Sequence, residues 1–138
     1  MSSLAKLSIK GSTLTPPTAS TAKESIPKQL SVLFDILSYK RPHFSDSEVA
    51  CIEKFIDTIP NIEQDAFGNR ILRIGKSATL FSCHTDTVHR TAGIQKLVYD
   101  SSMEIIYKDD KEPLGADDAA GIWILLQLIE AKVPGLYI

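Results

Sequence analysis

The sequence is poor in several features that would place it in a class at once. Its 138 residues include only two cysteines and one tryptophan, and the formal net charge is −2. Such a charge gives no electrostatic case for binding nucleic acid or an acidic membrane surface. No apolar run approaches the roughly 18 residues that a membrane span needs. We therefore expect no nucleic-acid partner and no membrane partner.

The two cysteines are too few for a disulfide framework. Cys51 falls in a predicted helix and Cys83 in a predicted strand, so we expect both to be reduced and buried. This cysteine usage and the absence of a secretory apolar core at the N-terminus favour a cytoplasmic protein.

Residues 1–26 differ in composition from the rest of the chain. They are rich in Ser, Thr, Ala, Pro and Lys, and no acidic residue precedes Glu24. Such a segment buries too little apolar surface to offset its ordering entropy, so we predict a flexible tail. A targeting peptide is the alternative, although the segment lacks arginine.

Residues 27–138 have the patterning of an α/β domain. One helix is predicted between Pro27 and Arg41, and a second begins at the capping-box sequence of residues 45–48 and ends at Pro60. Other segments predict a turn at 65–69, a strand from 70, a strand covered on both faces at 78–83, a hairpin at 96–107, a heavily buried helix at 119–131 and a strand start at 136–138. We expect a mixed β-sheet flanked by helices.

His84 and Asp86 leave the carboxyl end of the predicted strand at 78–83. Side chains two positions apart on extended backbone point the same way, so the Asp86 carboxylate can accept an imidazole N–H from His84. The other ring nitrogen is then free for a metal ion. The alternative is a local hydrogen bond in a turn.

Asp117 and Asp118 stand at the start of the last predicted helix, after a glycine and an alanine. A carboxylate in a first helical turn can simply cap the backbone and complement the dipole. Two adjacent carboxylates suggest that one caps while the other faces a cation, and a carboxylate can bridge two metal ions.

Three segments taken together resemble the co-catalytic zinc peptidases of the M20 clan, most closely the tripeptide aminopeptidase branch. They are Asp-Ala-Phe-Gly-Asn at 65–69, His-Thr-Asp-Thr-Val at 84–88 and Gly-Ala-Asp-Asp-Ala-Ala-Gly-Ile at 115–122. The resemblance implies that His84 binds one zinc ion, that Asp86 orients it as part of the catalytic machinery, and that Asp117 bridges two zinc ions. It also implies a cis peptide bond between Asp117 and Asp118, and a purely structural turn at Gly68 and Asn69.

The chain departs from this family in lacking the adjacent Glu-Glu pair that supplies a general base and a further ligand. Two ligands do not close a zinc site. We therefore expect the N-terminal portion of a catalytic domain, with an incomplete sheet that exposes an apolar edge or face. A second polypeptide or a homo-oligomer would cover it.

Two functions remain open at this point. The first is a two-zinc exopeptidase or amidohydrolase acting on a peptide or an N-acyl amino acid, inactive as this chain alone. The second is a non-catalytic relative that serves as a binding or structural module. Of the other candidates, His43 is expected to be a solvated loop residue, His89 a loop residue at the cleft rim, and Cys83 a buried thiol rather than a nucleophile.

Overall fold

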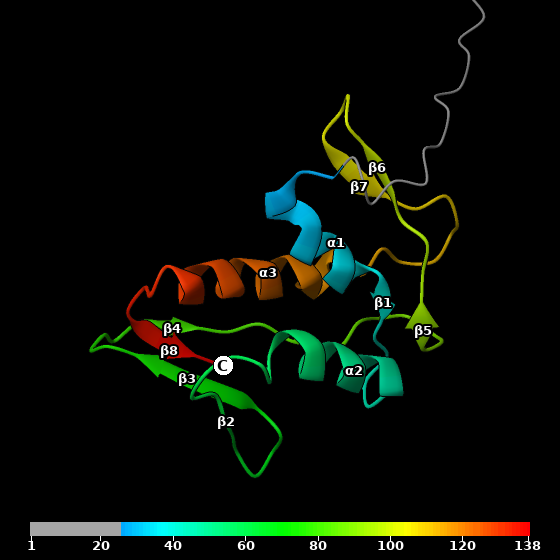
Figure 1. Cartoon of the computed structure of the whole chain (residues 1–138). Helices are drawn as coiled ribbons and strands as arrows, with labels where there is room; N and C mark the ends of the chain where they lie inside the picture. Colours follow the sequence, from blue (N-terminus) through cyan, green and yellow to red (C-terminus); the bar gives the residue numbers. More distant parts are fainter. Residues whose placement is uncertain (1–25) are drawn as a thin grey trace, which may run out of the picture.

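The computed structural model describes residues 26–138, and these form a mixed α/β fold (Figure 1). The predicted tail at 1–26 lies outside the described residues except for its last position. The helices are α1 (Ser31–Leu37), α2 (Asp46–Phe55) and α3 (Ala116–Glu130). The strands are β1 (Tyr39–Lys40), β2 (Glu63–Gln64), β3 (Arg70–Ile74), β4 (Leu80–Phe81), β5 (Gly93–Ile94), β6 (Val98–Asp100), β7 (Ile105–Tyr107) and β8 (Gly135–Tyr137).

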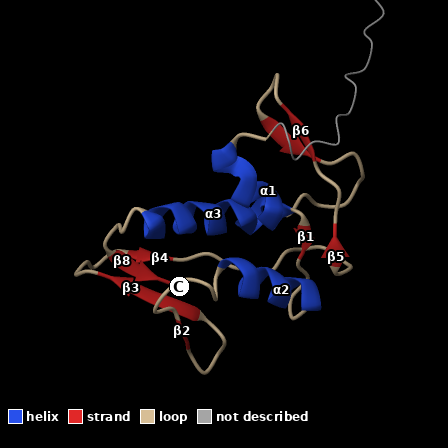
Figure 2. Cartoon of the chain, viewed as in Figure 1, coloured by secondary structure: helices blue, strands red, loops and turns tan. Residues whose placement is uncertain are grey.

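The largest sheet has four strands in the order β2-β3-β8-β4, and α3 runs along it (Figure 2). β8 is antiparallel to β3 and parallel to β4. The sheet is therefore mixed, as predicted, and residues 136–138 do lie in a strand. The predicted hairpin is present as β6 and β7, and β1 pairs with β5 in a small ribbon that the sequence did not indicate.

The core lies where α1 packs against α3. Its buried members are Ile36 and Leu37 of α1, Cys51 of α2, and Ala119 and Ile122 of α3. Burial of these apolar side chains is what holds the helices together. Among residues 26–138, no helix is both long and apolar enough to cross a lipid bilayer.

Two expectations about burial were wrong. The strand at 78–83 is only β4, and it is the last strand of its sheet rather than one covered on both faces, so Leu80 is 58% exposed. Helix α3 is not heavily buried either, because only Ala119 and Ile122 are inaccessible and Ile124 is 50% exposed.

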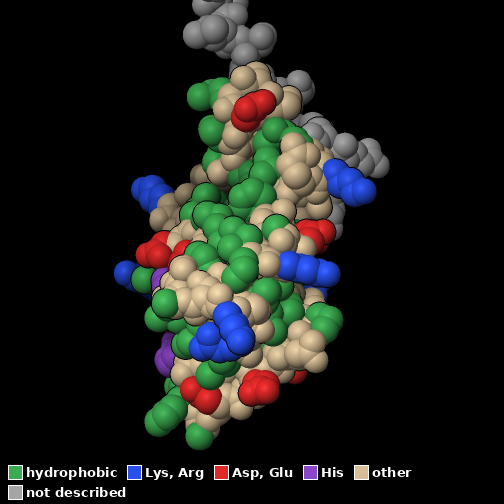
Figure 3. Space-filling view, turned by 90° about the vertical axis from the view of Figure 1, so that its left-hand side faces the viewer, with side chains coloured by type: hydrophobic (Ala, Val, Ile, Leu, Met, Phe, Trp, Pro, Cys, Tyr) green, Lys and Arg blue, Asp and Glu red, His purple; other side chains and the backbone are tan. Residues whose placement is uncertain are grey.

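The expected apolar exposure is present. Figure 3 shows hydrophobic side chains forming a continuous band along one face of the molecule. The exposed large apolar residues include Val32, Leu80, Met103, Ile105 and Ile124. Contiguous exposed apolar surface is uncommon on monomers.

Helix α2 begins as its sequence predicts and ends earlier. The Ser45 hydroxyl accepts the Glu48 N–H at 3.2 Å, which is one half of a capping box. The Glu48 carboxylate accepts the N–H of Phe44 rather than that of Ser45, because the Ser45 N–H is already donated to the Pro42 carbonyl. The helix ends at Phe55, not at Pro60.

The predicted turn at residues 65–69 joins β2 to β3 and is organised by one carboxylate. Asp65 accepts the side-chain N–H of Asn69 at 2.8 Å and the backbone N–H groups of Phe67 and Asn69 at 2.9 Å. These hydrogen bonds, with that from the Asn69 side chain foremost, lower the pKa of Asp65. Gly68 has a φ of 92°, a conformation that favours glycine.

We predict that Asp65→Ala lowers the stability at pH 7 and flattens its dependence on acid pH. A carboxylate with a depressed folded-state pKa stabilises the fold above its unfolded pKa of about 3.9, and this is lost as the pH falls through the folded value. Urea unfolding from pH 2 to pH 7 measures the effect. The exposed Asp109→Ala is the control, and equal pH curves for the two variants would contradict the role of Asp65.

Candidate functional site

The candidate site lies where the segment after β4 meets the start of α3. Backbone hydrogen bonds continue past the parallel pair β4 and β8, from Cys83 N–H to the Ile138 carbonyl at 3.1 Å. His84 therefore sits at the carboxyl end of a strand, where open α/β sheets place ligands. The position was predicted correctly, although the strand is less covered than expected.

The structure brings the three predicted site residues together. His84 Nδ1 lies 3.1 Å from Asp86 Oδ1 and 3.0 Å from the Asp86 carbonyl oxygen, and His84 Nε2 lies 3.1 Å from Asp117 Oδ1. Because both neighbours of Nδ1 are acceptors, Nδ1 carries a proton and donates it. The ring is thus held with Nε2 directed at Asp117.

Asp117 and Asp118 have different roles, as the sequence suggested. Both have non-helical backbone angles, so the regular part of α3 begins at Ala119. The Asp118 carboxylate caps it by accepting the Gly121 N–H at 2.9 Å, and a Cβ at Gly121 would collide with that carboxylate. The Asp117 side chain is 94% exposed and faces His84. The peptide bond between them is cis, as expected.

The environment of His84 raises the pKa of its ring. Burial lowers the pKa of His84, but hydrogen bonds to Asp117 and then Asp86 outweigh it, so the net shift is upward. A nitrogen that shares a proton with a carboxylate is also placed to share a metal ion with it. The arrangement is an imidazole and a carboxylate converging from two elements.

Thr85, between the two site residues, points the other way. Its hydroxyl donates to Glu48 Oε1 at 2.7 Å, which ties the segment after β4 to the first turn of α2. Glu48 is only 6% exposed. The alternation of side chains along extended backbone therefore gives this segment one face toward α3 and one toward α2.

Arg41 connects the elements that carry the site. It is fully buried, and its guanidinium donates to the carbonyls of Ile36 and Thr85 at 2.7 Å and, more weakly, to that of Gly115 at 3.5 Å. Burial lowers the pKa of Arg41, against the opposing effect of neighbouring acidic groups. These bonds join α1, the His84 segment and the residue before α3. A lone arginine beside a proline carries no sequence signal for such a role.

We predict that Arg41→Met lowers the free energy of unfolding by about 2–3 kcal/mol, because buried carbonyls lose their donors. Arg41→Lys should recover little of this, since one ammonium cannot replace a planar fork of donors. Urea denaturation measures both. Exposed Arg73→Met on β3 should change stability by no more than about 0.5 kcal/mol, and a similar loss in both methionine variants would contradict the role of Arg41.

His89 is not a loop residue at the cleft rim, as the sequence suggested, but is buried with 5% exposure. Its Nδ1 lies 2.6 Å from Thr87 Oγ1 and its Nε2 lies 3.1 Å from Gln95 Oε1. The Gln95 amide donates to the carbonyls of Leu37 and Leu114, so its oxygen is the acceptor toward His89. This donor order places a proton on Nε2 of His89.

The His89 ring also packs beneath the start of α3. A Cβ at Gly115 would come within 2.9 Å of His89 Cε1 and 3.2 Å of Thr87 Cγ2, and Gly115 has a φ of 76°. Only glycine fits this position without a shift. Thr87, His89 and Gln95 therefore form a buried polar layer that supports the backbone leading to Asp117. Scattered polar residues of this kind gave no pattern in the sequence.

We predict that His89→Ala costs about 1–3 kcal/mol of stability, because Thr87 loses a buried partner and the Gln95 oxygen keeps only its bond from Lys108. In ¹⁵N NMR spectra of the native chain, His89 should show the signature of a ring protonated at Nε2. Exposed His43→Ala is the control and should change stability by about 0.5 kcal/mol at most. A ring protonated at Nδ1 alone would contradict the donor order.

A cavity of about 280 Å³ opens beside the site, between α2, α3 and the four-stranded sheet. Its polar end contains His43, Glu48, His84 and Asp86. Its apolar walls include Ile52, Ile56, Leu72, Leu125, Leu126, Ile129 and Tyr137. Cys83 also lines it, and burial raises the pKa of this thiol to about 11. That value agrees with the expectation that Cys83 is not a nucleophile. Both cysteines were expected to be buried; Cys51 is, but Cys83 is only half-buried.

Comparisons of the chain with protein-family models, with curated proteins and with solved structures found no match. The site must therefore be interpreted from its own residues.

Proposed function

We propose that this chain contributes a metal-binding half-site to a zinc-dependent hydrolase of peptide or amide bonds, an exopeptidase or amidohydrolase of the M20 type. The observation that carries the proposal is the position of His84, which has a carboxylate 3.1 Å from each ring nitrogen. Asp86 precedes β5 and Asp117 begins α3, so two separate elements converge on one imidazole.

The donor set fits a zinc ion. Imidazole nitrogen and carboxylate oxygen are both common zinc ligands. Asp86 holds the proton on Nδ1, which leaves Nε2 as the ligand atom. The second Asp117 oxygen makes no hydrogen bond within the described residues. A carboxylate that bridges two ions needs such an available oxygen. His84 and Asp117 would hold the first ion, and Asp117 would also contact the second.

Bound zinc would supply Lewis acidity toward a scissile carbonyl and would make water nucleophilic at neutral pH. The chain's own residues orient this chemistry. Asp86 fixes the ring of His84, Asp118 caps α3 and leaves Asp117 free, and Arg41 holds the two segments in register. The sequence contains no Glu-Glu pair to act as a general base and a further ligand. The proposed substrate is a peptide or an N-acyl amino acid.

A second candidate is a non-catalytic metal-binding or structural module. It is favoured by the ligand number, since catalytic zinc sites use three protein ligands and His84 and Asp117 are two. A second polypeptide or a second copy of this chain, docked on the exposed apolar face, would complete the coordination in the catalytic alternative.

We predict that His84→Ala and Asp117→Ala each lower the affinity for Zn²⁺ by about tenfold or more, because loss of a direct ligand costs at least as much as loss of a supporting group. Competition with a chromophoric chelator, on the full chain, measures this. Asp109→Ala is the matched control and should bind like the native chain. An unchanged affinity in His84→Ala would contradict the proposal.

Hydrolysis assays separate the two candidates. Release of amino acids from dipeptides, tripeptides or N-acyl amino acids that requires Zn²⁺ and is lost in His84→Ala would favour the hydrolase. Zinc binding without hydrolysis, alone or with a partner that completes the site, would favour the non-catalytic module.

A further inference from the structure

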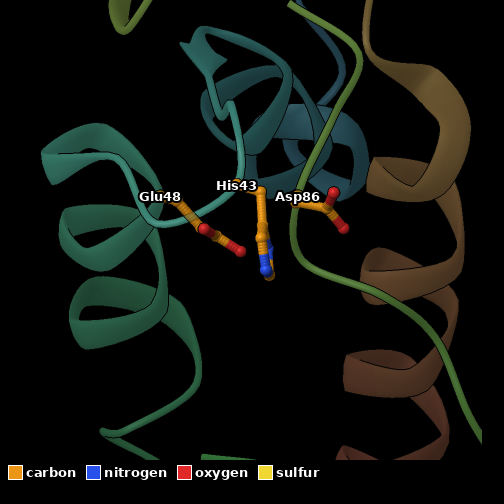
Figure 4. Close-up of side chains that lie close together, drawn as sticks. All are labelled: His43, Glu48 and Asp86. Carbon is orange, nitrogen blue, oxygen red and sulfur yellow. The ribbon is translucent and has the colours of Figure 1, made fainter.

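A second group of metal-binding side chains lies at the polar end of the cavity. His43 precedes α2, Glu48 is in its first turn, and Asp86 follows β4 (Figure 4). One ligand atom from each residue lies within 4.8 Å of the other two. From these residues we propose a second divalent-cation site, formed by His43, Glu48 and Asp86 and distinct from the pair His84 and Asp117.

The spacing is that of ligands around an ion rather than of partners in a hydrogen bond. No hydrogen bond or ion pair joins His43 to either carboxylate within the described residues, and its ring lies against that of Phe44. Ligands about 2.0–2.2 Å from a tetrahedral zinc ion stand roughly 3.3–3.6 Å apart. The three ligand atoms all lie within 4.8 Å of one another, and rotation of the exposed His43 side chain can bring its ring nitrogen to the distance that a shared ion requires.

The two carboxylates are already oriented and still have acceptor capacity. Glu48 accepts the Phe44 N–H at 2.6 Å and the Thr85 hydroxyl at 2.7 Å, one on each oxygen, and each carboxylate oxygen has a second lone pair. Asp86 uses Oδ1 on His84 and, among residues 26–138, makes no hydrogen bond through its other oxygen. The two carboxylates are thus held in place by the Phe44 N–H, the Thr85 hydroxyl and His84. Their remaining lone pairs are available to a cation.

The local charge also favours a cation. Glu48, Asp86 and Asp118 act electrostatically on the buried Arg41, and within residues 26–138 no lysine or arginine forms an ion pair with these three or with Asp117. Carboxylates gathered at the mouth of a cavity raise the local concentration of cations. The imidazole selects a first-row transition ion such as Zn²⁺ over Mg²⁺ and Ca²⁺, which prefer oxygen ligands.

The test uses the three histidines of the chain as separate reporters. The ring Cε1–H signals of the full chain are assigned with His43→Ala, His84→Ala and His89→Ala, and Zn²⁺ is then titrated with Mg²⁺ as the comparison. We expect the His43 signal to shift with Zn²⁺ but not with Mg²⁺, in the native chain and in His84→Ala. The buried His89 signal should stay in place and serves as the internal control.

Glu48→Gln should weaken the Zn²⁺ dependence of the His43 signal by about tenfold or more, whereas Glu53→Gln, on the exposed side of the same helix, should not. Amide spectra show whether the Glu48→Gln variant is folded. If it is unfolded, the surface variant His43→Ala provides the test instead, and it should bind less zinc per chain than the native protein. An unmoved His43 signal, or one with equal zinc dependence in both glutamine variants, overturns this site. If the His43 signal responds to Zn²⁺ but the His84 signal does not, the proposed function is overturned and the site at His43 is supported.

Discussion

The buried guanidinium of Arg41 is the interaction on which the arrangement of the site depends. A fully buried cation is costly unless its donors are satisfied, and here it donates to Ile36 at the end of α1, to Thr85 between the two site residues, and to Gly115 before α3. These three points are far apart in sequence. None of them can shift without leaving either a buried charge or a buried carbonyl unpaired, so the position of His84 relative to Asp117 follows from satisfying one side chain.

A buried polar layer continues this constraint. The Thr87 hydroxyl accepts the backbone N–H of Arg41 at 3.0 Å. From Thr87 the hydrogen bonds continue through His89 to Gln95, and from Gln95 to the carbonyls of Leu37 and Leu114. Each member has one donor assignment that satisfies its neighbours, and a fully satisfied network of this kind specifies a single arrangement. The exposed His84 and Asp117 can be held in place because their backbone rests on this buried layer.

The sequence predicted where the candidate site residues lie better than it predicted what supports them. His84 with Asp86, and Asp117 with Asp118, follow local rules of spacing and capping, so their placement could be predicted. The capping hydroxyl of Ser45 follows from the same kind of rule. Arg41, His89 and Gln95 act through contacts between distant segments, and a single sequence carries no period or motif for such contacts. The burial of β4 and α3 was predicted wrongly. An apolar run shows that a segment can be buried, but it does not show whether the described residues include other elements that pack over it.

Asp86 is where the two proposed cation positions meet, and its two carboxylate oxygens explain how they could coexist. One oxygen is committed to the Nδ1 proton of His84, while the other makes no hydrogen bond within the described residues, and a ligand oxygen of Asp86 lies within 4.8 Å of His43 and Glu48. A cation beside the second oxygen would withdraw negative charge from the first and weaken its hold on the His84 proton, whereas a metal ion on Nε2 would strengthen that same hydrogen bond by polarising the ring. The electrostatic effects of the two ions on Asp86 are therefore opposed, and the geometry implies that occupancy of either position lowers affinity at the other. Negative coupling of this kind would distinguish a shared carboxylate from two independent sites.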